Sequence, residues 1–501
     1  MWYDILIGFS TALEPSNFLA IVIGSIIGFS IGAFPALDTS VGTVLMVPLT
    51  FALPPSQAFL LLTALYCNGT YAGGVSAILF RIPGSSEAIM TTIDGYKMTE
   101  KGLANEALGY HLSASVIGGL LGALSLMFAT PFLTDVALRF GPAEYFALGV
   151  FGMTCVTGLT GTSVVRGFIT GAIGMFLATV GIDSISGMPR FTFGSGSLLS
   201  GIAFLPATIG LFAGAEIFKQ CARERPFSVS DGNDSSPDVP KRKVRIKLPP
   251  LSEFYRSNRK WLVIKSAIIG ILVGACPAVG ATTAAVVSYG AAARSSKHPE
   301  TFGTGEVEGI IAPEAGNNAC APAAFIPLLS LGIPGSANAA IILGAFLIHG
   351  LDAGPLFMVQ QKELAYTIMA GIFLSQLVMF GIPFVGVIPF MKLRALPGQI
   401  LVVFILSFAL VGSCASGTAY ALPQAVIMGI FGYFLEKGNF PLAPIVFGMV
   451  LGPIIERSLR RALLISQNNF LDVVSKPIAL VLLLGAVFVV IYPFLRRLAR
   501  K

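Results

Sequence analysis

Charged residues are scarce in this chain. Only 11% of its 501 residues are charged and 54% are hydrophobic, with a mean hydropathy of +0.81. A soluble globular protein carries about a quarter charged residues, so this composition excludes that class. It predicts an all-α polytopic membrane protein. At about 20 apolar residues a span plus a connection, the length allows about 10 to 14 transmembrane helices.

Metal-ligand and disulfide patterns are also missing. The three histidines show no His-Glu-x-x-His spacing, and the six cysteines are scattered without a Cys-x-x-Cys pair. These absences argue against a zinc site, a metalloenzyme and a disulfide framework. Nor is any nucleophile spaced with a base as an intramembrane enzyme would need. We therefore expect no enzyme activity, no bound metal and no cofactor, apart from Na⁺ or H⁺ as a coupling ion.

The N-terminus lacks the basic segment of a signal peptide. Asp4 and Glu14 precede the first long apolar run, and no Lys or Arg does. We expect the first span to remain in the mature protein.

Positive charge is concentrated in one polar segment, residues 219–260. It holds eleven Lys and Arg against five acids, a net of +6 out of the chain's formal +7. By the positive-inside rule this segment is a cytoplasmic linker, and so is the basic tail Leu495–Lys501. A nucleic-acid partner is the weaker interpretation of the same charge, and we do not expect one.

An internal repeat lies on either side of this linker. Ile-Pro-Gly-Ser occurs at Ile82–Ser85 and again at Ile333–Ser336, an offset of 251, and other Pro and Gly-Thr landmarks recur at offsets of 242 to 256. Such spacing indicates a duplicated unit. We predict a first repeat at 1–218, the linker at 219–260, a second repeat at 261–470, and an added helix with its tail at 471–501. The charge pattern favours an odd number of spans per repeat, hence inverted repeats.

Glycine and proline are abundant, with 56 and 31 residues. In a membrane, irregular backbone is tolerated only where protein buries it or where it lines a cavity. We expect broken or re-entrant helices at the two Pro-Gly-Ser motifs, and irregular backbone through Glu306–Asn338, whose helix breakers include Gly316, Pro322, Pro327, Gly332, Pro334 and Gly335. Asp94-Gly95 is expected to form a turn at a membrane edge.

Small polar residues flank these breaks and form the predicted substrate site. Hydroxyls, amides and the free N–H groups at helix starts suit a carboxylate. The alternative is structural, because Ser, Thr and Asn also cap helices and hydrogen-bond across bundles. The candidate substrate-binding residues are Ser85, Ser86, Asn68, Thr70, Asn317, Asn318, Ser336, Asn338, Thr39, Ser40, Thr282 and Thr283.

Glu314 is the candidate for cation coupling. A carboxylate at membrane depth can hold Na⁺ or carry a proton. The alternative places Glu314 in an aqueous loop with Glu306 and Glu308. Asp38 and Glu87 raise the same question in the first half.

The ordered motifs resemble the large membrane subunit of the tripartite tricarboxylate transporters, the TctA type. The first half is similar to that family's Y-G-G-S, I-P-G and D-G-Y-P-M elements, although Asp38, Val75 and Lys97 depart from its usual residues. The segments that carry the resemblance are Tyr71–Gly74, Ile82–Gly84, Asp94–Tyr96, Glu306–Gly309, Ala312–Ala315, Asn317–Asn318, Ile326–Leu329 and Leu331–Ser336.

This resemblance implies a multi-pass protein of the bacterial inner membrane, in contact with membrane lipid. It implies uptake of a di- or tricarboxylate driven by a cation gradient. The expected partners are a small membrane subunit and a periplasmic solute-binding protein. A stand-alone organic-anion permease of the same fold remains the alternative, and an intramembrane enzyme ranks last.

Overall fold

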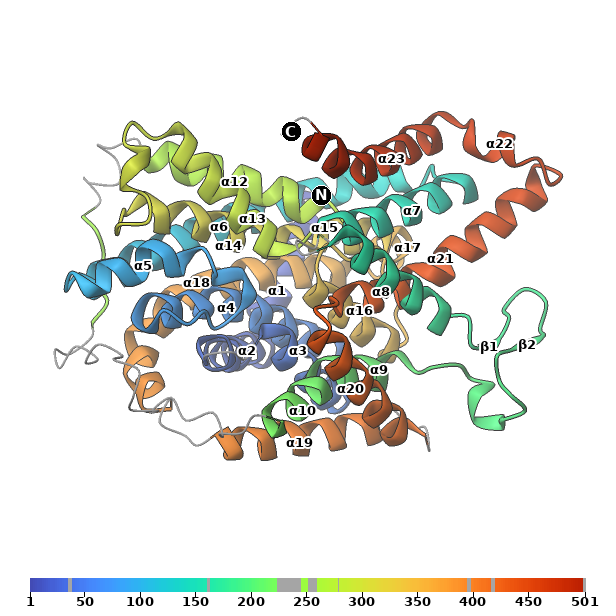
Figure 1. Cartoon of the computed structure of the whole chain (residues 1–501), viewed down its shortest axis with the longest axis horizontal. Coiled ribbons are helices and arrows are strands. Elements are labelled where there is room, and N and C mark those ends of the chain that lie inside the picture. The colour runs from blue at the N-terminus through green and yellow to red at the C-terminus, as the bar shows by residue number, and fades with distance from the viewer. Residues whose placement is uncertain are drawn as a thin grey trace.

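The structure is a computed structural model that describes residues 1–34, 38–159, 163–222, 245–250, 259–277, 279–393, 398–415 and 420–498. Most of these residues are helical. The strands described are one short antiparallel pair, β1 (Gly181–Ile182) and β2 (Pro189–Arg190). The all-α prediction is confirmed for the described residues, and Figure 1 shows the hairpin projecting from one end of a helical body.

The first half of the chain holds ten helices outside the masked stretches. A 3₁₀ turn at Ser86–Ala88 precedes α5, and a π-helical turn at Gly210–Gly214 joins α9 to α10. The helices of this half are α1 (Trp2–Ala12), α2 (Pro15–Ala33), α3 (Thr39–Met46), α4 (Pro55–Phe80), α5 (Thr91–Glu100), α6 (Ala104–Ala137), α7 (Pro142–Leu159), α8 (Val164–Leu177), α9 (Phe204–Ile209) and α10 (Ala215–Cys221).

The second half begins at Arg259. Its helices are α12 (Arg259–Ala275), α13 (Gly280–Ser295), α14 (Glu308–Ala323), α15 (Phe325–Leu331), α16 (Ala337–Ile348), α17 (Pro355–Gln360), α18 (Lys362–Leu393), α19 (Gly398–Ala415), α20 (Ala421–Lys437), α21 (Ala443–Ile465), α22 (Phe470–Val474) and α23 (Pro477–Leu498).

The two halves share a local structure at the Pro-Gly-Ser motifs. Arg81 and Gly332 both end a helix in the left-handed conformation, with φ of 59° and 74°. The N–H of Gly84 donates to the carbonyl of Gly73 at 3.2 Å, and Gly335 donates to Ala324 at the same distance. All three pairs are 251 positions apart. The breaks expected at both motifs are therefore present, and they are built alike.

Close glycine contacts repeat as well. A Cβ on Gly32 of α2 would lie 2.1 Å from the Gly69 carbonyl oxygen of α4, and one on Gly274 of α12 would lie 2.5 Å from the Cys320 carbonyl oxygen of α14. The backbones of α2 and α4, and of α12 and α14, thus pack together without side chains between them, as small residues allow in membrane bundles.

Each half also packs its central helix against the long helix of the other half. α4 lies against α18, and α14 lies against α6. Cβ atoms on Gly118 and Gly122 of α6 would both lie 2.4 Å from α14 carbonyl oxygens. The halves therefore interlock, and α4 and α14, which contact each other, form the centre of the molecule.

The stretch Glu306–Asn338 is far more regular than predicted. α14 runs unbroken through Pro313, Gly316 and Pro322, and every residue from Gly309 to Ala323 is buried. A proline removes one hydrogen bond and kinks a helix, but neighbouring helices enclose this one. The irregular backbone of this stretch lies at Glu306 and Val307, at Ala324 between α14 and α15, and at 332–336. Asp94-Gly95 also differs from the prediction, because both residues lie inside α5.

Membrane spans can be assessed only for the described residues. Three helices there are long and apolar enough to cross a bilayer, namely Pro15–Ala33, Ala104–Ala137 and Lys362–Val387, and five shorter apolar helices accompany them. A helix of 12 residues is about 18 Å long, short of the roughly 30 Å hydrocarbon core. Such short helices are what broken spans produce. The predicted total of 10 to 14 spans stays a prediction.

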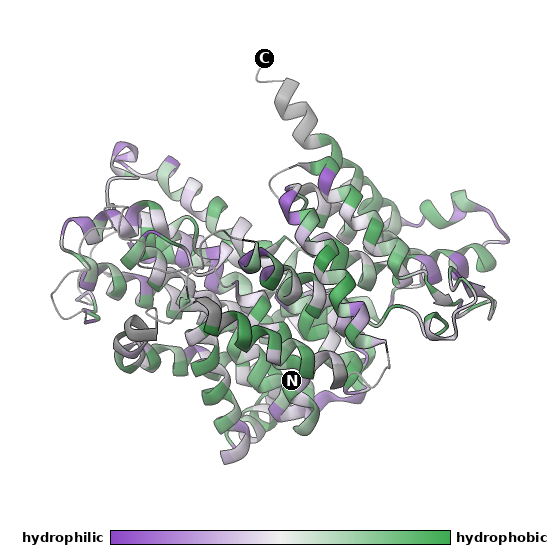
Figure 2. Ribbon diagram, turned by 60° about the horizontal axis from the view of Figure 1, so that its bottom comes forward, coloured by the Kyte–Doolittle hydropathy of each residue, from purple (hydrophilic) through white to green (hydrophobic). Residues whose placement is uncertain are grey.

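Apolar side chains cover much of the outer surface. Val403 and Phe404 on α19 and Leu484 and Phe488 on α23 are more than half exposed, and apolar residues dominate the helical body in Figure 2, with hydrophilic ones gathered toward its extremities. An exposed apolar surface of this extent suits contact with lipid.

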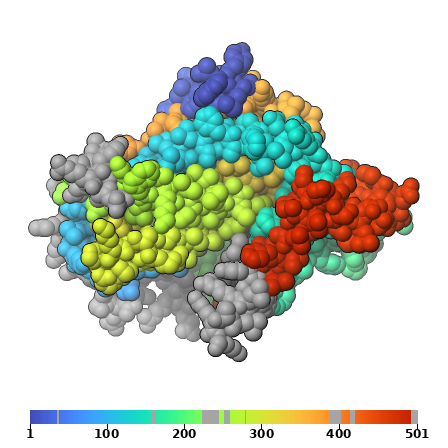
Figure 3. All heavy atoms as spheres, turned by 90° about the horizontal axis from the view of Figure 1, so that it is seen from above, coloured from blue at the N-terminus to red at the C-terminus, as the bar shows by residue number. Residues whose placement is uncertain are grey.

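The ends of the chain lie on different flanks. In Figure 3 the N-terminal α1 stands out beside α18, and the C-terminal helices form a separate flank.

Of the predicted linker, residues 245–250 lie against the start of α6, where the Lys247 ammonium contacts the Glu106 carboxylate at 2.9 Å. The remainder of that linker between α10 and α12, and the side chains of the basic tail, lie outside the described residues, as do the repeat landmarks Pro35, Gly161-Thr162, Pro397 and Gly417-Thr418.

Candidate functional site

Three helix starts converge at the first Pro-Gly-Ser break. The Asp38 carboxylate caps α3 by accepting the Ser40 N–H at 2.9 Å, and it also accepts the Ser86 hydroxyl at 3.1 Å and the Ser86 N–H at 3.4 Å. From the second half, the Thr282 hydroxyl lies 3.4 Å from the Ser86 hydroxyl. The starts of α3 and α13 and the first break therefore share one polar cluster, which we call the Asp38 cluster (Asp38, Ser40, Ser86, Thr282).

The second break is tied to the first half of the chain. The Tyr66 hydroxyl of α4 lies 3.1 Å from the Ser336 hydroxyl, which also accepts the Ala339 N–H and so caps α16. The Thr43 hydroxyl of α3 donates to the Asn338 amide oxygen at 3.1 Å. Both breaks are thus held by residues of the opposite half.

Ser85 and Thr39 are buried, and their hydroxyl oxygens have no hydrogen-bond partner among the described residues. Ser85 packs on Gly73, and Thr39 packs on Gly69. Buried hydroxyls are normally hydrogen-bonded, so these two groups are available to a bound ligand. Thr283, by contrast, donates to the Val279 carbonyl at 3.1 Å within its own helix start.

Asn68 and Thr70 form their side-chain hydrogen bonds with residues other than the asparagine pair of α14. The Asn68 amide donates to the Ser25 hydroxyl and to the Ala64 and Ser375 carbonyls, so it links α2, α4 and α18. The Thr70 hydroxyl donates to the Tyr66 carbonyl one turn back. Asn68 therefore forms the hydrogen bonds between helices that were the alternative to a role in substrate binding.

Glu314 lies in the middle of α14 and is fully buried, so it does not belong to an aqueous loop. Glu306 does lie in the loop before α14, and Glu308 is its first residue. The Glu314 carboxylate accepts hydrogen bonds from the Ser115 hydroxyl at 3.3 Å, the Asn317 amide at 3.4 Å, the Asn318 amide at 3.3 Å and the Thr91 hydroxyl.

His111 completes this cluster. Apart from its place in an apolar run, no pattern in the sequence points to this histidine. Its Nδ1 lies 3.2 Å from the Glu314 Oε2, with both side chains fully buried. Its Nε2 lies 3.1 Å from the Tyr71 carbonyl oxygen. The Tyr71 ring stacks on the imidazole with centroids 4.5 Å apart and planes 8° apart. We call His111, Glu314, Thr91, Ser115, Asn317 and Asn318 the Glu314 cluster.

Glu87 joins the two clusters. It follows Ser86 in the 3₁₀ turn, it is buried, and its Oε2 has no hydrogen-bond partner in the part of the chain that the structure describes. Its carboxyl lies beside the Thr70 hydroxyl, while its carbonyl accepts the Asn317 amide at 3.4 Å. A polar path thus runs from the Asp38 cluster to the Glu314 cluster through Glu87 and Asn317.

Asp94 has a structural role. Its Oδ1 accepts the N–H groups of Gly303 and Gly305 at 2.8 Å and of Glu306 at 2.9 Å, and its Oδ2 accepts the Tyr289 hydroxyl at 2.9 Å. The carboxylate therefore fixes the loop that leads into α14.

The buried ionisable side chains of this region are mostly acidic. Glu87, Glu314 and Asp94 are buried, while no Lys or Arg among the described residues is. Those residues also contain no group of three or more His, Cys, Asp or Glu side chains arranged to hold a metal ion. An anion that enters the region must therefore bring compensating positive charge with it or find it there as a proton or a bound cation.

Known proteins resemble this chain along most of its length. Residues 18–447 match the family described as the tripartite tricarboxylate transporter TctA family. An Agrobacterium vitis protein titled "Uncharacterized 52.8 kDa protein in TAR-I ttuC' 3'region" is 35% identical over 499 residues, which cover 98% of this chain and 97% of the relative.

A second Agrobacterium vitis protein, titled "Uncharacterized protein in TAR-II ttuC' 3'region", is 37% identical over 226 residues, or 44% of this chain and 93% of the relative. No solved structure matches the chain.

Proposed function

Because this chain belongs to the tripartite tricarboxylate transporter TctA family, we propose that it is the membrane subunit that carries a di- or tricarboxylate into the cell. The family makes it a component of a transporter and not an enzyme. Its location in the bacterial inner membrane, as a multi-pass protein, is part of the proposal.

The convergence of the helix breaks supports a substrate site between the Asp38 cluster and the second break. The hydroxyls of Ser86 and Thr282 lie on one side, and Ser336 and Asn338 at the start of α16 lie on the other. Unpaired N–H and hydroxyl groups at helix starts favour carboxylates. The partnerless hydroxyls of Ser85 and Thr39 add two donors.

The buried acidic side chains of the region support coupling to a cation. A carboxylate substrate beside Asp38 and Glu87 is repelled unless protons or cations bind with it, because Coulomb repulsion is strong where water is excluded. Cation-driven uptake follows from this requirement. The duplicated breaks favour two repeats of inverted orientation, with substrate bound where they meet.

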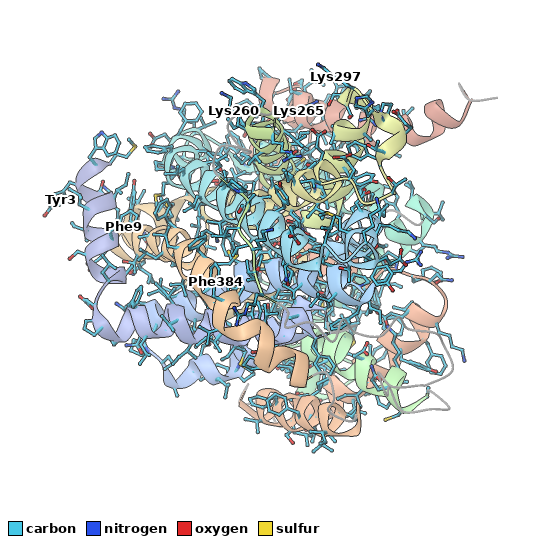
Figure 4. All side chains as sticks on the ribbon, turned by 90° about the vertical axis from the view of Figure 1, so that its left-hand side faces the viewer. Tyr3, Phe9, Lys260, Lys265, Lys297 and Phe384 are labelled. Atoms are coloured by element: carbon cyan, nitrogen blue, oxygen red, sulfur yellow. The ribbon has the colours of Figure 1, made fainter. Side chains whose placement is uncertain are left out.

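Basic residues favour one orientation in the membrane. Lys260, Lys265 and Lys297 gather at one end of the molecule in Figure 4, and the Lys265 ammonium donates to the Ser295 hydroxyl at 3.1 Å across α12 and α13. By the positive-inside rule this end faces the cytoplasm. The opposite end then receives substrate from a periplasmic binding protein, in a complex that includes a small membrane subunit.

Uptake tests this function. Cells that lack the gene are complemented with the intact gene region, and the uptake of radiolabelled citrate, malate and succinate is measured. We expect at least one of these probes to accumulate only when the gene is present. If none does, carboxylate transport is contradicted.

Membrane vesicles from these cells test the tripartite arrangement. Uptake should require added periplasmic extract, because the binding protein delivers the substrate. Equal uptake without the extract would contradict the tripartite proposal and identify a stand-alone permease.

A further inference from the structure

We propose that His111 and Glu314 together hold one proton, and that this proton is the ion whose gradient drives uptake. This inference rests on the proposed transport function and assigns its coupling site. The proton is bound at the contact between α6 of the first half and α14 of the second half.

The hydrogen bond at Nε2, the ring nitrogen of His111 that faces away from Glu314, determines which nitrogen is protonated. His111 Nε2 lies 3.1 Å from the Tyr71 backbone carbonyl oxygen, and a carbonyl oxygen can only accept. Nε2 must therefore carry a hydrogen. The partner of one ring nitrogen fixes the protonation of the other, so a neutral His111 presents a bare lone pair at Nδ1.

That lone pair faces a carboxylate oxygen. Nδ1 lies 3.2 Å from the Glu314 Oε2, and neither side chain is exposed. Two lone pairs at this distance repel, and burial strengthens the repulsion. Nδ1 forms no hydrogen bond with a described residue. One proton, bound to Nδ1 as N–H or to Oε2 as O–H, would give this nitrogen a partner and turn the contact into an attraction.

No neighbouring group replaces the proton that His111 and Glu314 require. The titratable side chains that face it are Tyr71 from α4 and Glu87 from the 3₁₀ turn. Thr91 of α5, Ser115 of α6 and the two asparagines of α14 supply neutral donors to Glu314. None of these groups brings a positive charge to Nδ1.

The pair has no room to shift within its site. A Cβ on Gly74 would lie 2.4 Å from the His111 Cε1 and 2.8 Å from the Glu314 Oε1, and one on Gly118 would lie 2.4 Å from the Ala315 carbonyl oxygen. Packed interfaces change between discrete arrangements and do not deform smoothly. Loss of the proton therefore acts on the contact between α6 and α14 as a whole.

The proton site reaches the substrate region through Asn317. Its amide donates both to the Glu314 carboxylate and to the Glu87 carbonyl, each at 3.4 Å. A proton taken from water on one side of the membrane and returned to water on the other involves no oxidation and no other bond. Its binding and release can thus be linked to the breaks that hold the substrate.

Vesicles prepared with the intact gene region test the coupling. Two assays are compared: accumulation of radiolabelled citrate, malate or succinate driven by a proton gradient, and exchange of external for internal label without a gradient. The Glu314→Gln and His111→Gln variants should keep exchange but lose accumulation. His298→Gln and Glu300→Gln should behave as wild type, since that pair has the same 3.2 Å contact but is 73% and 69% exposed.

Accumulation by Glu314→Gln equal to wild type would overturn the proposal, as would wild-type accumulation driven by a Na⁺ gradient with no proton gradient. If wild type exchanges none of the probes, the transport function fails and not the proton site. The proton site is then tested by a measurement that needs no substrate.

Nitrogen NMR of labelled histidine supplies that measurement. It also tests the proton site if a variant loses exchange together with accumulation. The chain has three histidines, and His111→Gln identifies the signal of His111. We expect a protonated Nε2, and an Nδ1 signal that shifts in Glu314→Gln because its proton partner has changed. An unprotonated Nε2, or an Nδ1 signal unmoved by Glu314→Gln, would overturn the proposal.

Discussion

Gly74 packs directly on His111 and Glu314 and leaves no space for a side chain there. We expect Gly74→Ala to destabilise the protein by about 1–3 kcal/mol, since overpacking forces neighbours to move, and to reduce carboxylate uptake. Gly381→Ala is the matched control, because nothing lies within 4 Å of its Cβ position. Thermal unfolding in detergent measures both variants. Equal melting temperatures would show that the packing around His111 is looser than described.

Ser336 is the residue that joins α16 to α4. Ser336→Ala should cost about 1 kcal/mol through loss of the helix cap. Ser336→Leu should abolish uptake while the protein still inserts in the membrane, because a bulky side chain fills the proposed substrate region.

The control is Ser407→Leu on the exposed surface of α19, where the serine hydroxyl bonds only the Val403 carbonyl one turn back. Uptake and the amount of protein in the membrane are measured for each variant. Normal uptake by Ser336→Leu would remove the second break from the substrate site.

Among single residues, the sequence can predict site candidates that belong to a repeated motif or that are isolated charges in an apolar run. Ser86 and Ser336 stand beside Pro-Gly breaks and Glu314 is an acid in an apolar run, so they were selected as candidates. His111 was not, because one histidine in an apolar helix has no pattern, and its partner Glu314 is 203 positions away. Asn68 was given a site role that its bonds to Ser25 and Ser375 do not need. Such pairings depend on which helices pack together.

α5 and the loop before α14 depend on Asp94. Asp94→Asn keeps the shape but removes the charge that strengthens four hydrogen bonds, and bonds to charged groups are worth about 1.5–3 kcal/mol each. We expect a loss of about 2 kcal/mol and faster proteolysis near Gly303–Glu306. The exposed Asp472→Asn serves as the control. Unchanged proteolysis would mean that another contact holds this loop.

The hairpin β1–β2 is held to α21 by ion pairs. The Arg460 guanidinium contacts the Asp183 carboxylate at 2.9 Å, and Arg190 contacts Glu456 at 2.6 Å. The Ser186 hydroxyl, the Arg460 guanidinium and two backbone N–H groups hold the pKa of Asp183 well below its ordinary value.

A carboxyl whose pKa is lower in the folded state stabilises that state above its unfolded pKa of about 4, and the contribution is lost as the pH falls. We expect proteolysis of the hairpin to accelerate below about pH 4 in wild type. In Arg460→Gln this acid step should shrink. An acid step of the same size in both proteins would contradict the role of this pair.

Element boundaries show where local reasoning fails. The breaks at both Ile-Pro-Gly-Ser motifs were predicted, because a left-handed residue and a proline in a buried segment leave few alternatives. The regular helix through Pro313, Gly316 and Pro322 was not, since tertiary packing on all sides of α14 overrides the low helix propensity of these residues. The same effect keeps Asp94-Gly95 inside α5.

The whole molecule is organised around two central helices, α4 and α14, each enclosed by helices of both halves. The internal repeat was visible in the sequence as an offset of 251 between equivalent prolines. The interlocking was not, because no periodicity records which half a helix packs against. This arrangement places both Pro-Gly-Ser breaks against residues of the opposite half, and motion of one half against the other would alter both.

A structure of the complete transporter with a bound carboxylate tests the central claim most directly. The carboxylate chosen is a probe that the uptake assay shows to accumulate. We predict density for it between the two breaks, within hydrogen-bond reach of Ser86 or Thr282 on one side and of Ser336 or Asn338 on the other. Density for the substrate elsewhere, with both breaks empty, would contradict the account.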